Sequence, residues 1–193
     1  MVVMAEVVLF HHAQGLTKGV TAFADDLRRR GHTIHTPDLY EGQTFDSLDE
    51  GVAHAREVGF DTIGARGVAA AQSLPEEVVY AGISLGLGAA QQLAQTRPGA
   101  RGAILLAGAL PVSEFSPTWP AGLPVQVHAK EHDPEFDNEW DKPAAEALVA
   151  EAGGELFLYP GDQHLFMDSS LPAYDAEATA LLLDRLDAFL AGL

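Results

Sequence analysis

A serine stands between two glycines in a pattern suited to a nucleophile. Residues 82–86 read Gly-Ile-Ser-Leu-Gly, with an apolar strand-like run at 77–81 before them and a helix-like run at 85–96 after them. In such a strand-to-helix turn the serine is strained and exposed above the sheet, and the glycines keep side chains clear of neighbouring backbone. The following helix N-terminus favours developing negative charge. Ser84 is therefore the candidate nucleophile; an ordinary tight turn is the alternative, and a phosphate loop is disfavoured because no G-x-G-x-x-G accompanies it.

A serine hydroxyl needs a general base, and the base needs an acid that orients it. His164 lies in a loop after the apolar run at 155–159, and Asp133 lies in a loop after the run at 125–129. The chain order Ser, Asp, His is the one found in α/β-hydrolases. Taken singly, His164 could be a surface imidazole and Asp133 a turn-capping residue. The acids that rival Asp133 are Glu131, Asp137 and Asp162.

The oxyanion formed by such an attack needs two N–H donors. The backbone amide of Leu85, directly after the nucleophile, is the first candidate. The second should come from the loop at 11–16, where we expect the amide of Ala13, with that of His12 as the weaker alternative. The adjacent His11 and His12 do not predict a metal site, because consecutive residues of an extended chain point to opposite faces.

The elements that must position these residues alternate between strands and helices. Short apolar strands separated by helices predict an α/β fold with a mainly parallel sheet and helices on both faces. The candidate residues then all lie beyond the C-terminal ends of strands, where open α/β sheets bind ligands. We expect strands at 7–10, 32–36, 77–81, 102–107, 125–129 and 155–159, and helices at 17–30, 61–73, 85–96, 139–152 and 173–191; residues 45–59 are ambiguous, and 111–124 is a Pro-rich surface loop beside the site.

Length and composition narrow the function further. The 193 residues predict a single domain over 1–193, and 28 Asp and Glu against 11 Lys and Arg give a net charge of −17. That charge disfavours nucleic acids and anionic membranes as partners. The absence of cysteine excludes a thiol nucleophile. Without a signal-peptide pattern or a run of ~18 apolar residues, we expect a cytoplasmic protein. We also expect it to be a monomer or a weak homodimer.

The sequence resembles the dienelactone hydrolase family of α/β-hydrolases over nearly its whole length. The resemblance implies a compact hydrolase without a large lid, which needs no cofactor and has Ser84, Asp133 and His164 as its triad. It rests on HHAQGL at 11–16, TPDLYEG at 36–42, GISLGLGAA at 82–90, HDPEF at 132–136, YPGDQHLF at 159–166 and PAYDAEA at 172–178.

The chain departs from the lactone-cleaving members at three positions. Ser84 stands in place of a cysteine nucleophile, and serine needs more help from a general base. The resemblance also implies that His12 replaces a carboxylate and that Asp168 replaces an arginine that grips the substrate carboxylate. An acid at 168 would repel an anionic lactone. We therefore expect His12, Phe166 and Asp168 to line the substrate pocket; Arg56 and Arg66 fit solvated helix faces better than a compensating cation.

These observations predict a serine hydrolase that cleaves a small, neutral ester or lactone through an acyl-enzyme. Two alternatives stay open: a carboxylesterase or thioesterase for longer acyl groups, and a non-catalytic small-molecule binding protein that kept the fold. Dehalogenase-like chemistry is disfavoured because it needs an aspartate where Ser84 stands.

Overall fold

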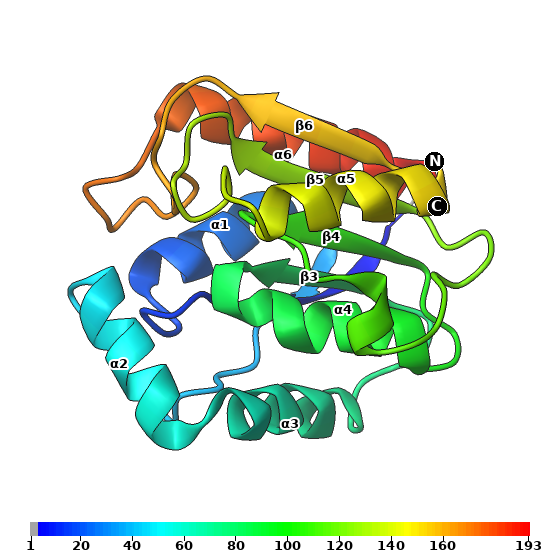
Figure 1. Ribbon diagram of the computed structural model, residues 1–193, viewed down its shortest axis with the longest axis horizontal. Coiled ribbons are helices and arrows are strands. Elements are labelled where there is room, and N and C mark those ends of the chain that lie inside the picture. The colour runs from blue at the N-terminus through cyan, green and yellow to red at the C-terminus, as the bar shows by residue number, and fades with distance from the viewer. Residues whose placement is uncertain (1–3) are drawn as a thin grey trace.

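The computed structural model describes residues 4–193 and contains a six-stranded sheet (Figure 1). The strand order is β2-β1-β3-β4-β5-β6, and every neighbouring pair is parallel. All the carboxyl ends therefore meet at one edge, which is where loops can carry a shared site. The strands are β1 (Glu6–Phe10), β2 (Thr33–His35), β3 (Val79–Ile83), β4 (Gly102–Leu106), β5 (Val125–Lys130) and β6 (Glu155–Tyr159).

Helices cover both faces of the sheet, as expected from the sequence. Figure 1 shows α1 and α6 on one side and α3, α4 and α5 on the other. Val7 and Leu9 pack with the first group, and Val8 and Phe10 pack with the second, because successive strand residues point to opposite faces. The helices are α1 (Lys18–Arg29), α2 (Leu48–Val58), α3 (Phe60–Ala71), α4 (Leu87–Thr96), α5 (Asp141–Ala152) and α6 (Ala176–Ala191). None of the helices described here is long and apolar enough to cross a membrane.

The ambiguous stretch at 45–59 contains the helix α2, which spans Leu48–Val58. Ser47 caps it by accepting a hydrogen bond from the amide of Glu50, and two acidic residues lie in its first turn. Only Gly51 and Ala55 of this helix are buried. The apolar periodicity is weak there because α2 buries so little of its surface.

The structure shifts several predicted boundaries. β3 continues through Ile83 instead of ending at Ala81, because Gly82 and Ile83 pair with residues of β4. The helix expected from residue 85 is divided into the 3-10 turn η1 (Ser84–Gly86) and α4. The last helix begins at Ala176, three residues later than expected. The Pro-rich segment 111–124 contains the short turn η2 (Val112–Glu114) and is anchored by the buried Trp119.

Candidate active site

Ser84 sits on a strained turn at the end of β3. Its φ angle is 49°, a left-handed conformation that costs free energy for a residue other than glycine. A Cβ on Gly82 would lie 2.4 Å from the carbonyl oxygen of Gly86, and a Cβ on Gly86 would lie 2.4 Å from that of Phe10. Both flanking glycines are therefore required by close backbone contacts, as predicted from the sequence.

The side chains of Ser84, His164 and Asp133 form a continuous hydrogen-bonded chain. The Ser84 Oγ lies 2.8 Å from His164 Nε2, and His164 Nδ1 lies 2.6 Å from Asp133 Oδ2. A carboxylate only accepts, so Nδ1 carries the proton and the Nε2 lone pair faces the serine hydroxyl. Asp133 is fully buried and His164 is 13 % exposed. This arrangement can remove a proton from Ser84 when the oxygen attacks an electrophile.

The rival acids lie elsewhere. Asp137 bonds Lys142 at 2.8 Å, while Glu131 and Asp162 are exposed. Asp133 is further held by the amide of Glu135, which donates to Oδ1 at 2.9 Å. One oxygen of Asp133 is thus fixed by backbone and the other is aimed at the imidazole.

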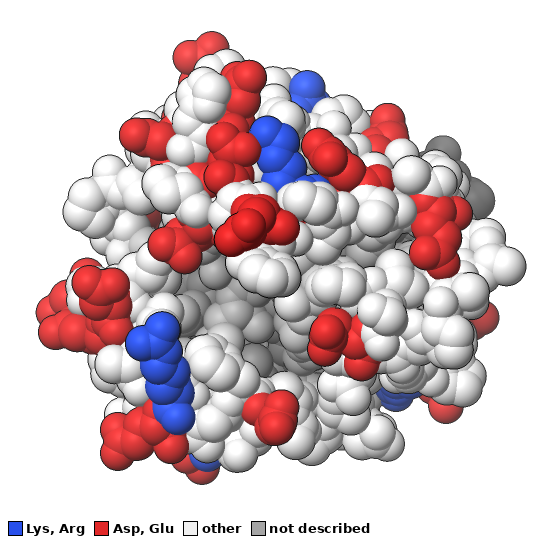
Figure 2. Space-filling view, in the orientation of Figure 1, with Lys and Arg blue, Asp and Glu red and all other residues white. Residues whose placement is uncertain are grey.

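A cavity of about 370 Å³ opens beside Ser84 and His164. Two carboxyl groups line this cavity, those of Glu135 and Asp141. Burial raises the pKa of Asp141. Within residues 4–193, no Lys or Arg lines this cavity. Figure 2 shows the surface hollowed on this face, with acidic side chains at several points around the hollow. The larger apolar side chains of the lining are Leu39, Phe60, Ile63, Leu85, Leu87 and Leu110.

The amides of Leu85 and Ala13 stay predicted oxyanion donors. Both belong to backbone segments that other parts of the structure hold in place. The amide of Leu85 is in the first turn of η1, where N–H groups have no intrahelical acceptor. The loop with Ala13 packs on the elbow, since a Cβ on Gly86 would meet the carbonyls of Phe10 and His11. On its other side, a Cβ on Gly51 would lie 2.1 Å from the Ala13 carbonyl oxygen. Helix α2 therefore fixes this loop from outside.

The structure places His12, Phe166 and Asp168 away from the cavity. All three are 0 % exposed, and none is among the residues that line the hollow beside Ser84. They therefore do not line this pocket, contrary to the sequence expectation. His12 and Asp168 bond each other at 2.7 Å, and Phe166 packs on the ring of Tyr159. The predicted repulsion between Asp168 and an anionic substrate loses its basis, because that carboxylate is enclosed by hydrogen-bond donors.

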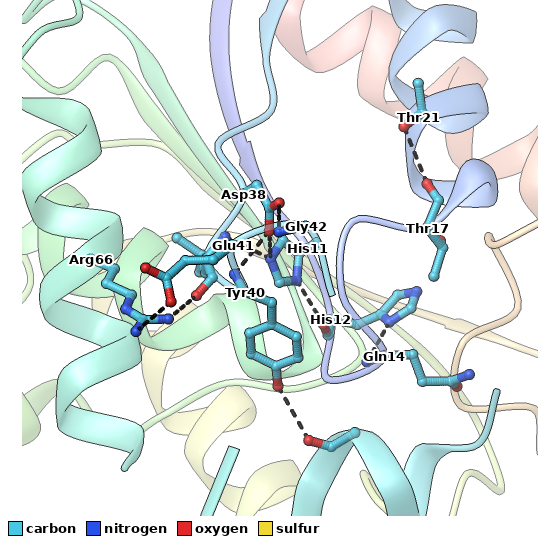
Figure 3. A network of polar contacts seen from close by, with 12 residues as sticks. His11, His12, Gln14, Thr17, Thr21, Asp38, Tyr40, Glu41, Gly42 and Arg66 are labelled. Atoms are coloured by element: carbon cyan, nitrogen blue, oxygen red, sulfur yellow. Dashed lines mark hydrogen bonds and ion pairs between the residues drawn. The ribbon is translucent and has the colours of Figure 1, made fainter. Parts of the chain in front are cut away.

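The adjacent histidines have separate partners (Figure 3). His11 donates from Nδ1 to the carbonyl of His12 at 2.8 Å and accepts the amide of Leu39 at Nε2. Burial lowers the pKa of His11 to about 4, so its ring stays neutral. His11 thereby ties the segment with Leu39, a cavity residue, to the loop after β1.

Arg56 and Arg66, which the sequence offered as possible cations near the substrate, do not line the cavity. Arg66 donates to the Leu39 carbonyl at 2.8 Å and pairs with Glu41, as Figure 3 shows, and Arg56 is exposed on α2. Sequence reasoning missed the apolar wall from α3 and the acids Glu135 and Asp141. The motif at 36–42 contains Leu39 and could have pointed to this side of the cavity, but no sequence motif includes the α3 residues that line it.

A parallel sheet with a serine elbow after β3, and with acid and histidine loops after β5 and β6, defines the α/β-hydrolase fold. Solved structures of other proteins share this fold. A dienelactone hydrolase-like promiscuous phosphotriesterase from metagenomic libraries matches with a TM-score of 0.75 and 20 % identity, over 98 % of this chain and 86 % of that one. The dienelactone hydrolase from Anabaena variabilis matches with a TM-score of 0.65 and 17 % identity, over 96 % and 84 %.

The chain belongs to the dienelactone hydrolase family, whose model matches residues 3–192. It is therefore a hydrolase by family, as the motif resemblance implied. A cold-adapted esterase from an Arctic intertidal metagenomic library, solved with zinc bound, is a further structural neighbour, with a TM-score of 0.60 and 21 % identity over 97 % of this chain and 82 % of that one. Among curated proteins, no significant match was found.

Proposed function

We propose that this protein is a serine hydrolase that cleaves a small, neutral ester or lactone, with Ser84 as the nucleophile in place of cysteine. The observation that carries the proposal is the hydrogen-bonded chain from Ser84 through His164 to Asp133, at 2.8 and 2.6 Å. Acyl transfer needs an alcohol, a base and an orienting acid in this order. Ser84 and His164 line the cavity, so a substrate carbonyl bound there can reach the serine oxygen.

The reaction has two halves. The Ser84 oxygen attacks the carbonyl carbon while His164 Nε2 takes the hydroxyl proton, and Asp133 stabilises the resulting imidazolium. The oxyanion is held by the amides of Leu85 and Ala13. Collapse of this intermediate releases the alcohol, which receives the proton from His164, and leaves the acyl-enzyme. His164 then takes a proton from water as the water oxygen attacks the carbonyl carbon of the acyl-enzyme. When this second intermediate collapses, His164 returns that proton to the Ser84 oxygen, so that the carboxylic acid leaves and Ser84 and neutral His164 are restored.

The cavity supports a small, uncharged substrate. Its volume of about 370 Å³ lies near the lower end of the ~300–1,000 Å³ found for small-molecule sites. Its apolar wall suits an acyl or ring carbon skeleton. The carboxylates of Glu135 and Asp141 disfavour an anionic group nearby.

Labelling with a fluorophosphonate probe tests the proposed function. The probe should modify the intact protein at a single site, and mass mapping should place it on Ser84. The Ser84→Ala variant is the matched control and should take up no label. Failure of the native protein to react would favour a binding protein that retains the fold without the chemistry.

A second candidate, an esterase or thioesterase for longer acyl groups, is favoured by Phe60. This side chain lines the cavity yet is 52 % exposed, so a long acyl chain could extend over it. Turnover of p-nitrophenyl esters of increasing chain length separates the two. Highest kcat/KM for acetate or butyrate supports the small-substrate proposal, and highest kcat/KM for octanoate or longer supports the second.

The charge preference can be tested at Asp141. We expect native protein to prefer neutral lactones over carboxylated ones, and Asp141→Asn to reduce that preference about tenfold, or ~1.4 kcal/mol, by removing a repulsive charge. The measurement is the ratio of kcat/KM for a matched neutral and carboxylated pair. Asp137→Asn is the control, because that exposed acid pairs with Lys142 and does not line the cavity. A native preference for the carboxylated lactone would contradict the charge argument.

A further inference from the structure

One buried hydrogen bond joins the two loops on which the proposed chemistry depends. His12 Nε2 lies 2.7 Å from Asp168 Oδ2, and both side chains are 0 % exposed. His12 precedes Ala13, whose amide is the proposed second oxyanion donor. Asp168 follows His164 by four residues. The contact therefore connects the oxyanion loop to the loop of the general base, across 156 residues of chain.

The ring of His12 also fixes the turn that contains Ala13. The amide of Gln14 donates to His12 Nδ1 at 3.2 Å, and the amide of Gly15 donates to the His12 carbonyl at 3.0 Å. Because Nδ1 accepts, Nε2 must carry the proton that is donated to Asp168. Figure 3 shows His12 beside Gln14. The peptide group after Ala13 is thus held by the His12 ring, and the peptide group before it is held by the Gly15 amide.

Asp168 is held as firmly at its own end. Burial opposes its charge, but hydrogen bonds from His12, Ser170 and Thr17 outweigh burial and lower the pKa of Asp168 to about 2. Thr17 donates at 2.5 Å and caps α1, while the Ser170 hydroxyl donates at 2.6 Å. A Cβ on Gly19 would lie 1.5 Å from Asp168 Oδ1, so the carboxylate sits against the first turn of α1, where the helix dipole favours it.

The segment between His164 and Asp168 transmits this anchoring. Leu165, Phe166 and Met167 are buried, and the amide of Asp168 closes a turn onto the Leu165 carbonyl at 3.1 Å. A displacement of Asp168 in this packed turn must displace His164. The same displacement pulls on His12 and the Ala13 amide.

We propose that His12 and Asp168 are positioning residues that hold the oxyanion loop and the His164 loop in one fixed geometry for the reaction. This inference rests on the proposed function. The pair acts on kcat and not on substrate binding, because neither residue lines the cavity. Its loss leaves Ser84, His164 and Asp133 present but less well aligned with the oxyanion donors.

Two substitutions at His12 test the proposal. Asn can still accept from the Gln14 amide but is too short to reach Asp168, whereas Gln places an amide N–H near the position of Nε2. We expect His12→Asn to lower kcat about 100-fold on a neutral p-nitrophenyl ester, with KM nearly unchanged, since small misplacements of reacting groups cost about this much. His12→Gln should recover much of that loss. Equal losses of kcat in both variants would overturn the proposal.

His128→Gln is the matched control, because His128 is also 0 % exposed, makes two side-chain hydrogen bonds and does not line the cavity. It should lower thermal stability and leave kcat within a few-fold of the native value. If His12→Asn fails to fold, Ser170→Ala serves in its place, because the exposed Ser170 loses only one donor to Asp168. That variant should show a several-fold fall in kcat at constant KM, and an unchanged kcat would count against the pair.

Amide hydrogen exchange separates this inference from the proposed function. In His12→Asn or Ser170→Ala, residues 11–16 and 162–169 should gain exchange together, a readout that needs no turnover. If native protein hydrolyses no ester, the proposed function fails and exchange alone decides whether the two loops are coupled. Increased exchange in only one of the two segments would refute the coupling.

Discussion

Replacing Ser84 with Ala should lower kcat/KM for a short p-nitrophenyl ester by about 10⁴-fold or more, because the oxygen that forms the acyl-enzyme is gone. The fold should survive. Alanine keeps the backbone of the elbow, and its Cβ occupies the same left-handed conformation that Ser84 already adopts at φ 49°. Steady-state kinetics and a thermal unfolding curve on the same preparation check both expectations.

The residual rate of Ser84→Ala discriminates between mechanisms. The cavity stays intact in this variant, so substrate should still bind. Turnover close to that of the native protein would show that another group attacks the ester, and the mechanism would be wrong. Loss of turnover together with loss of the folded state would instead direct the test to Ser84→Gly, which relieves the strained φ.

Replacing Asp133 with Asn should lower kcat by about 10⁴-fold while KM changes little, because asparagine favours the wrong tautomer of the catalytic imidazole. In the native protein Asp133 Oδ2 accepts from His164 Nδ1 at 2.6 Å, which leaves Nε2 free to take the Ser84 proton. An amide group at this position offers an N–H to Nδ1 and turns the lone pair away from the serine. Pre-steady-state kinetics should show slower acylation and slower deacylation, because His164 is the base in both steps.

Asp162→Asn is the matched control for this prediction. Asp162 is two residues from His164 in sequence, yet it is exposed, and Asp133 is the acid that bonds the ring. We expect kcat of Asp162→Asn to stay within a few-fold of the native value. A larger loss in this variant than in Asp133→Asn would reassign the orienting acid.

The sequence by itself determined the fold class and the order of the triad candidates. Short apolar runs such as the one at 77–81 are typical of strands covered on both faces of a parallel sheet, so their alternation with helices specified the α/β architecture. Gly82 and Gly86 marked the elbow because close backbone contacts admit no other residue there. These signals are local, and local signals can be read along the chain.

The tertiary structure alone decided which side chains reach the cavity. His12 and Asp168 flank the triad in sequence, but they face each other in the interior, whereas Phe60, Glu135 and Asp141 carry no motif and line the hollow. The sequence already favoured Asp133 over Asp162 as the orienting acid, and the structure adds the 2.6 Å contact between Asp133 and His164. The physical reason is that the direction of a loop side chain depends on what packs beneath the loop, and those partners lie up to 156 residues away.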